Sequence, residues 1–133
     1  MPENADSLTG RTALITGAAR RIGREIALAL ARAGARTLIH YNSSQTEAEN
    51  LVTLIRSENG RAEAFQADLC DPRQAADLLP NAARAVGPID IVVNNASIFP
   101  TDSVRDTTPE ALDRNMHLHL HAPLLLSRAL AAQ

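Results

Sequence analysis

Lysine is absent from this chain of 133 residues, and all 13 basic side chains are arginines. The chain alone therefore cannot perform chemistry that needs a lysine amine. Cys70 is the only cysteine, which excludes an internal disulfide and fits a reducing compartment. The first seven residues are polar, and no apolar run approaches the roughly 20 residues that span a bilayer. We therefore expect a cytoplasmic protein without a membrane segment.

Aromatic residues are also scarce, at 2% of the chain. Apolar residues nevertheless make up 45%, so a hydrophobic core must be built from Ala, Leu, Ile and Val. The formal net charge is -2, and this balance gives no indication of nucleic acid or an anionic membrane as a partner. The length suits one domain, residues 1–133, or a piece of one.

Short apolar runs alternate with segments of helical periodicity. Strands are predicted at residues 12–16, 36–41, 62–67 and 89–93, and helices at 21–33, 45–58 and 72–86, followed by a helical region after Thr108 in which a break is possible. This alternation is typical of βαβ units. It predicts an α/β fold of the Rossmann type, a doubly wound parallel sheet in the strand order 3-2-1-4. Because the last apolar helix has no capping residue after it, we expect the domain to be truncated at its C-terminal end.

The turn between the first strand and the first helix is the most informative segment. Gly17 follows the strand at once, and Gly23 stands six residues later. A glycine turn that leads into a helix N-terminus presents backbone N–H groups to a phosphate, and two arginines add positive charge. An ordinary structural turn is the alternative. We predict that the phosphates of a nucleotide cofactor are bound by Gly17, Arg20, Arg21 and Gly23, and that Ile22 belongs to the same cofactor site.

The second predicted strand ends in His40-Tyr41-Asn42-Ser43-Ser44. Dinucleotide-binding folds that select NAD carry an acidic residue at this place, which binds the ribose hydroxyls. No carboxylate is present here, and hydroxyls with nearby arginines suit a 2′-phosphate. We therefore predict NADPH (NADP) as the cofactor, with Asn42, Ser43 and Ser44 on its 2′-phosphate side. Ser43 and Ser44 are also expected to cap the next helix.

Polar residues follow the third and fourth predicted strands as well. Asp68 either binds an adenine amino group or caps the turn before Asp71, and the spacing leaves both open. Residues 94–97, Asn-Asn-Ala-Ser, lie where the ligand crevice of such a sheet is expected. An Asx turn is the alternative for this segment.

Three histidines, His117, His119 and His121, alternate in the last helical region. On a helix, His117 and His121 share a face and His119 points elsewhere. No carboxylate or cysteine cluster completes a ligand set, so we predict no metal site.

Together these motifs resemble those of the short-chain dehydrogenase/reductase family, from about residue 8 to residue 133. The turn from Thr16 to Gly23 is similar to the family's Thr-Gly-x-x-x-Gly-x-Gly motif, and Asn94-Asn95-Ala96 to its Asn-Asn-Ala-Gly motif. Asp68 matches the family's adenine-side aspartate. The resemblance implies that the adenine is bound by Asp68 and Leu69, and that the nicotinamide side is lined by Asn95, Ala96 and Ser97.

Two departures from the family pattern resemble the pteridine reductases and the similar bacterial dihydromonapterin or dihydrofolate reductases. Arg21 replaces the middle glycine of the turn, and Ser97 replaces the last glycine of Asn-Asn-Ala-Gly. Residues 40–43 resemble the segment with which that subgroup holds NADPH, which adds Tyr41 to the predicted cofactor site. Residues 97–100 resemble its pterin site, which implies that Ser97 and Phe99 bind substrate. The alternative for Phe99 is a loop residue that covers the core.

The family's catalytic pair, Tyr-x-x-x-Lys, has no match, because Tyr41 is the only tyrosine and lysine is absent. His119 stands at the place of the family's helix asparagine, part of its proton relay, and its participation in a relay is left open. The resemblance implies the cofactor-binding half of an NADPH-dependent oxidoreductase, inactive alone, with a pterin-like small-molecule substrate. A homo-oligomer, commonly a tetramer, is implied at full length. The alternatives are a 3-oxoacyl or other ketone reductase of the same family and a non-catalytic dinucleotide-binding module.

Overall fold

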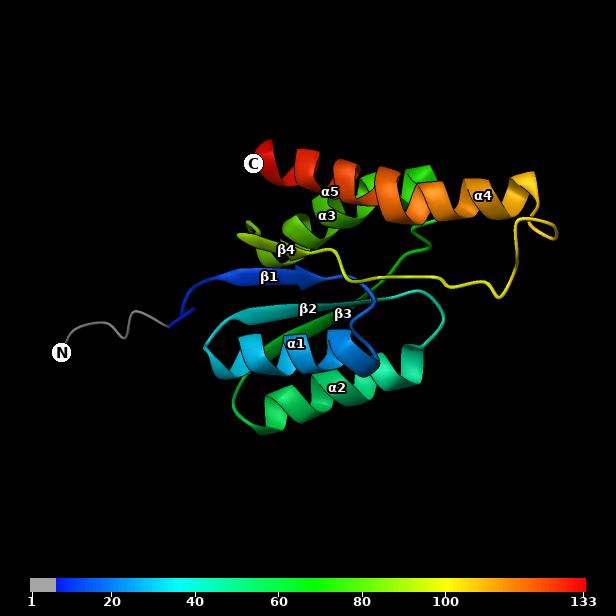
Figure 1. Ribbon diagram of the computed structural model, residues 1–133. Coiled ribbons are helices and arrows are strands. Elements are labelled where there is room, and N and C mark those ends of the chain that lie inside the picture. The colour runs from blue at the N-terminus through cyan, green and yellow to red at the C-terminus, as the bar shows by residue number, and fades with distance from the viewer. Residues whose placement is uncertain (1–6) are drawn as a thin grey trace.

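The computed structural model describes residues 7–133 as a parallel sheet between two layers of helices (Figure 1). The elements follow in the order β1 (Thr12–Ile15), α1 (Arg21–Arg32), β2 (Arg36–Tyr41), α2 (Gln45–Ser57), β3 (Arg61–Gln66), α3 (Pro72–Val86), β4 (Ile91–Val93), α4 (Pro109–Met116), the π-helical segment η1 (His117–His121) and α5 (Ala122–Ala131). All strand pairs are parallel, in the order β3-β2-β1-β4. The predicted α/β sheet of order 3-2-1-4 is confirmed.

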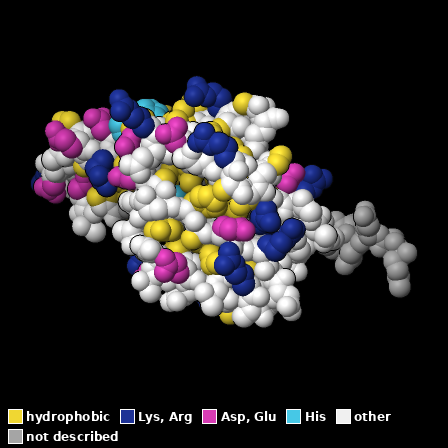
Figure 2. Space-filling view, turned by 180° about the vertical axis from the view of Figure 1, so that it is seen from behind, with side chains coloured by type: hydrophobic (Ala, Val, Ile, Leu, Met, Phe, Trp, Pro, Cys, Tyr) yellow, Lys and Arg dark blue, Asp and Glu magenta, His cyan; other side chains and the backbone are white. Residues whose placement is uncertain are grey.

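Successive residues of the central strand serve two separate cores. Ala13 and Ile15 of β1 pack on the side of α1 and α2, whereas Leu14 packs on the side of α3 and α5. Side chains of a strand alternate between faces, and all four residues of β1 are buried because helices cover both faces. This explains why its last three residues, Ala13-Leu14-Ile15, form an uninterrupted apolar run. On the face seen in Figure 2, charges of both signs are interspersed around a central group of hydrophobic side chains.

Most predicted boundaries agree with the structure to within two residues. α3 begins at Pro72 as expected, because the Asp71 carboxylate accepts the backbone N–H of Arg73 at 2.9 Å. The prediction that serines cap α2 is wrong. Ser44 occupies the N-cap position with φ -88° and ψ 57°, and its side chain makes no capping hydrogen bond.

The last helical region is continuous, so the break that the sequence left possible does not occur. α4, η1 and α5 follow one another as one long rod, and α5 packs along α3 (Figure 1). Large apolar side chains recur along this rod at four-residue spacing and are exposed: Leu112, Met116, Leu120 and Leu124. Residues four apart lie on one face of a helix, so they form an apolar stripe.

Among the helices of residues 7–133, none combines the length and apolar character that a membrane span requires.

Candidate functional site at the carboxyl ends of the strands

A pocket of about 480 Å³ lies at the carboxyl ends of the strands. β1 has β2 on one side and β4 on the other, so the strand order reverses at β1. Open α/β sheets bind ligands at such a switch point. Segments far apart in the chain line the pocket: Gly17, Ala19, Arg20, Arg21, Ile22, Gly23, His40, Tyr41, Asn42, Ser43, Ser44, Asp68, Leu69, Cys70, Asn95, Ala96, Ser97, Ile98, Arg114 and Leu118.

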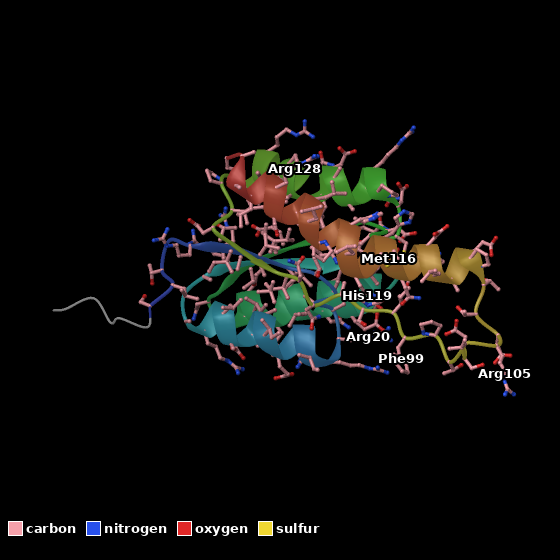
Figure 3. All side chains as sticks on the ribbon, turned by 45° about the horizontal axis from the view of Figure 1, so that its top comes forward. Arg20, Phe99, Arg105, Met116, His119 and Arg128 are labelled. Carbon is pink, nitrogen blue, oxygen red and sulfur yellow. The ribbon has the colours of Figure 1, made fainter. Side chains whose placement is uncertain are left out.

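Every residue predicted from the sequence to bind the cofactor lines this one pocket. Their binding of a cofactor stays a prediction, but the structure brings all of them together. Phe99 is not in the lining: it is 91% exposed on the segment between β4 and α4 (Figure 3). The alternative that Phe99 covers the core is therefore wrong, and its contact with a substrate stays a prediction.

The glycine turn packs so closely that larger residues do not fit at two positions. Gly17 has a φ of +61°, and a Cβ there would lie 2.8 Å from Cα of Ala96. A Cβ on Gly23 would lie 2.4 Å from the carbonyl oxygen of Gly17 and 2.5 Å from Nδ2 of Asn95. These distances are shorter than van der Waals contact, so the absence of a side chain lets α1 begin against the turn.

A hydrogen-bonded clamp joins the glycine turn to the end of β4. Oγ1 of Thr16 accepts the backbone N–H groups of Asn95 and Ala96, both at 3.0 Å. In return, Nδ2 of Asn95 donates to the carbonyl oxygens of Thr16 at 3.0 Å and Gly17 at 3.1 Å. The side chain of Asn95 is thus committed to the turn, and the Asx-turn alternative is wrong for this residue. The clamp holds the two loops at a set separation.

His40 lines the pocket, although the sequence did not lead us to predict it as a site residue. Its side chain is 2% exposed. Nδ1 accepts the backbone N–H of Gly17 at 2.9 Å, and Nε2 lies 2.9 Å from the carbonyl oxygen of Ala67. Because a carbonyl only accepts, Nε2 carries the proton and the ring is neutral. One feature of the sequence could have pointed to His40: it is a polar residue that directly follows the buried pair Leu38-Ile39.

Burial lowers the pKa of His40, against the opposing effects of its hydrogen bond to Ala67 and of the Asp68 charge. Burial disfavours the charged imidazolium, because no water solvates it. The neutral ring connects the turn after β1, the end of β2 and the end of β3. Its protonation would place an N–H at Nδ1 against the N–H of Gly17.

Positive charge gathers where α1 begins. α1 has no acidic residue in its first turn, and its N-cap residue, Arg20, makes no side-chain capping bond. In the described part of the chain, neither Arg20 nor Arg21 forms an ion pair. Two guanidinium groups therefore flank the positive end of the helix dipole, an arrangement that favours phosphate. Arg21 has a φ of 53°, a left-handed conformation that glycine adopts without strain.

Asp68 caps the turn after β3, which is one of the two roles predicted for it. Its Oδ1 accepts the backbone N–H of Cys70 at 2.9 Å, which closes the turn after β3. Binding of adenine by Asp68 stays a prediction. Arg114 of α4 also lines the pocket, and no local pattern in the sequence pointed to it.

His119 lies beside Ser97, with Nε2 3.1 Å from the serine Oγ. The rings of His117 and His121 pack against each other, with centroids 5.0 Å apart. Among residues 7–133 no group of three or more His, Cys, Asp or Glu side chains is arranged to hold a metal ion.

The chain is similar in sequence to known proteins over nearly its whole length. Residues 11–133 match the family model described as short chain dehydrogenase. A short-chain type dehydrogenase/reductase of Picea abies is 40% identical, over 93% of this chain and 49% of its own length. Versicolorin reductase 1 of Aspergillus parasiticus is 38% identical, over 91% of this chain and 46% of its own. The chain spans about half the length of the curated relatives it matches.

A solved structure with a similar fold is FolM alternative dihydrofolate reductase 1 from Brucella canis, complexed with NADP. It superposes with a TM-score of 0.88 at 35% identity, over 96% of this chain and 51% of its own. The likeness therefore covers the sheet and the pocket described above.

Proposed function

Since this chain belongs to the short-chain dehydrogenase/reductase family, we propose that it forms the cofactor-binding part of an NADPH-dependent reductase. One observation carries the proposal. A single pocket is lined by the glycine turn, by Arg20 and Arg21, which form no ion pair among the described residues, and by the end of β2, which has no carboxylate. NADP in the Brucella canis relative supports it. NADPH would supply the hydride, and these 133 residues contain no Tyr-x-x-x-Lys pair to supply the proton.

The residues present fit NADPH better than NADH. Gly17 and Gly23 let the turn pack against Ala96 and Asn95, where a Cβ would clash. This packing places the start of α1 at the pocket, where its N–H groups can bind a pyrophosphate. Arg20 and Arg21 offer charge-assisted hydrogen bonds to phosphate. Ser43, which also lines the pocket, offers a hydroxyl near the place where NAD-selective folds carry an acid.

We further propose a pterin-like substrate. Support comes from Arg21 and Ser97, the two departures that resemble those of the pteridine reductases, and from the likeness to the alternative dihydrofolate reductase of Brucella canis. Versicolorin reductase 1, a relative that is not named for a pterin, is comparably similar in sequence, so a ketone reductase of the same family is the second candidate. Rates of NADPH oxidation with a dihydropterin and with a 3-oxoacyl ester, measured on the protein as its gene encodes it, decide between them.

Titration of this chain with NADPH and NADH tests the cofactor. We expect NADPH to bind at least about tenfold more tightly, because one charge-assisted hydrogen bond to the 2′-phosphate contributes about 1.5–3 kcal/mol and 1.4 kcal/mol is tenfold. Fluorescence of the reduced nicotinamide reports both affinities. Equal affinities for the two cofactors would contradict the proposal.

Arg21→Gly separates the strain of the turn from its charge. Glycine adopts a φ of 53° freely, so we expect the free energy of unfolding to stay level or rise by up to about 1 kcal/mol. NADPH affinity should fall about tenfold, because a guanidinium is lost. Chemical denaturation and NADPH titration of the same sample measure the two effects. A stable variant with undiminished affinity would show that Arg21 does not bind phosphate.

We also propose a homo-oligomer, tetrameric at full length, in the cytoplasm. The apolar stripe Leu112, Met116, Leu120 and Leu124 supports association, since such a surface is stabilised when covered. The molar mass of the encoded protein in solution, with and without Leu120→Asp, tests it.

A further inference from the structure

A serine and a histidine from distant segments meet beside the pocket. Ser97 follows β4, and His119 lies in η1. Nε2 of His119 is 3.1 Å from Oγ of Ser97, and Nδ1 of the same ring is 3.1 Å from the backbone carbonyl oxygen of Asn115. His119 lies on the side of the helical rod toward the glycine turn, where it shares a small recess with Thr16 and Ala96 (Figure 3).

The carbonyl of Asn115 determines which nitrogen of His119 carries the proton. A carbonyl oxygen only accepts hydrogen bonds, so Nδ1 must be the donor. In the neutral ring Nε2 is then unprotonated, and it can only accept the hydroxyl proton of Ser97. One backbone carbonyl of the helix therefore sets the direction of a hydrogen bond made outside the helix.

This direction decides what Ser97 offers to the pocket. A serine hydroxyl has one proton and two lone pairs. Nε2 of His119 at 3.1 Å is a closer acceptor for the proton than the carbonyl oxygen of Ile98 at 3.5 Å. Only lone pairs remain toward a ligand. An N–H or NH2 group facing Ser97 gains a hydrogen bond, whereas a ketone oxygen meets a second acceptor and gains none.

We propose that His119 is a positioning residue that makes Ser97 select N–H donors, so that the ligand group facing Ser97 is an amide or amino nitrogen of a planar heterocycle. The proposal rests on the proposed function and deepens it. Two sources carry this chemistry: the carboxamide of the nicotinamide and the amino or ring N–H groups of a pterin-like substrate. A ketone substrate, the second candidate above, would not use the pair.

The proton position is measured without any ligand. Long-range 1H–15N NMR of this chain shows which nitrogen of each imidazole is protonated. We expect the Nδ1–H form for His119, and a change in its Nε2 shift in Ser97→Ala. An Nε2–H form would overturn the role of His119, because the ring would then donate to Ser97 and free the hydroxyl proton for the pocket.

Ser97→Ala identifies the source of the donor. If the nicotinamide carboxamide faces Ser97, NADPH affinity falls about fivefold, the effect of one neutral hydrogen bond. The affinity for 2′-phospho-ADP-ribose, which lacks nicotinamide, then stays unchanged. If the substrate faces Ser97, KM for a 2-amino-4-oxo-dihydropteridine rises about fivefold in the encoded protein at unchanged NADPH affinity. Either result supports the proposal, and no change in both measurements overturns it.

His119→Phe tests the positioning role, because it leaves Ser97 free to turn its proton toward the pocket. If the substrate faces Ser97, we expect the preference for the pteridine over a 3-oxoacyl ester, read as the ratio of KM values, to fall about fivefold; if the nicotinamide faces Ser97, we expect NADPH affinity to fall about fivefold instead. His121→Phe, the same change at an exposed histidine of the same segment, is the matched control. An unchanged KM ratio together with an unchanged NADPH affinity in His119→Phe overturns the positioning role. Failure of the wild-type chain to bind NADPH would instead overturn the proposed function, whatever tautomer His119 shows.

Discussion

Alanine in place of Gly23 is expected to weaken NADPH binding by about 100-fold or more, or about 2.8 kcal/mol. The new methyl group would lie 2.4 Å from the carbonyl oxygen of Gly17 and 2.9 Å from Cα of Ala18. Both neighbours are backbone atoms of the turn, so the turn itself must move, and its N–H groups move away from the phosphates. Overpacking of this kind also lowers the free energy of unfolding by about 1–3 kcal/mol. NADPH titration and chemical denaturation measure the two losses.

Gly10→Ala is the matched control for this experiment. Gly10 has a φ of +84° and lies outside the pocket, and no atom lies within 4 Å of the place that a methyl group would occupy there. We expect backbone strain of about 1 kcal/mol and unchanged NADPH affinity. If Gly23→Ala folds and binds NADPH like the wild type, the glycine turn does not hold the phosphates.

Phenylalanine in place of His40 is expected to lower the free energy of unfolding by about 3 kcal/mol. The ring fills the space, but the part-buried N–H of Gly17 and the buried carbonyl of Ala67 lose their partners, at up to about 1–3 kcal/mol each. His40→Gln carries both an acceptor and a donor on its amide, so it should recover part of the loss. NADPH affinity should follow the same order, because Gly17 belongs to the turn. Equal stability of the Phe and Gln variants would contradict the role of the two hydrogen bonds.

The pH dependence of stability gives an independent test of His40. Burial lowers its pKa in the folded protein, while in the unfolded chain it titrates near 6.5. Below pH 6.5 the unfolded state therefore binds a proton that the folded state does not, and stability falls as the pH decreases toward the folded pKa. The slope approaches about 1.4 kcal/mol per pH unit, the value for one proton. We expect His40→Gln to lack this pH-dependent part of the free energy of unfolding. Parallel curves of stability against pH for the two proteins would exclude a contribution from His40.

Much of the site could be predicted because its parts are short and each follows a strand. The Gly17 turn, the polar segment from Tyr41 to Ser44, Asp68 and the Asn95 segment each stand after one strand of the predicted sheet. Parallel strands bring their carboxyl ends to one edge, so local patterns were enough to assemble them in a single pocket. The serine caps of α2 were wrong, because cap geometry depends on the backbone angles of one residue.

The sequence alone determined the strand order, the residues that gather at the sheet edge, and the absence of a lysine-dependent catalytic pair from this chain. These follow from periodicity, from the handedness of βαβ crossovers and from composition. Only the tertiary structure decided which atoms bond: His40 to Gly17 and Ala67, Asn95 to the glycine turn, and Ser97 to His119. The two residues joined by each of these bonds are separated by 22 to 78 positions in the sequence. Whether two such groups lie within hydrogen-bond distance or several ångströms beyond it depends on the register and packing of whole elements, which no local pattern encodes.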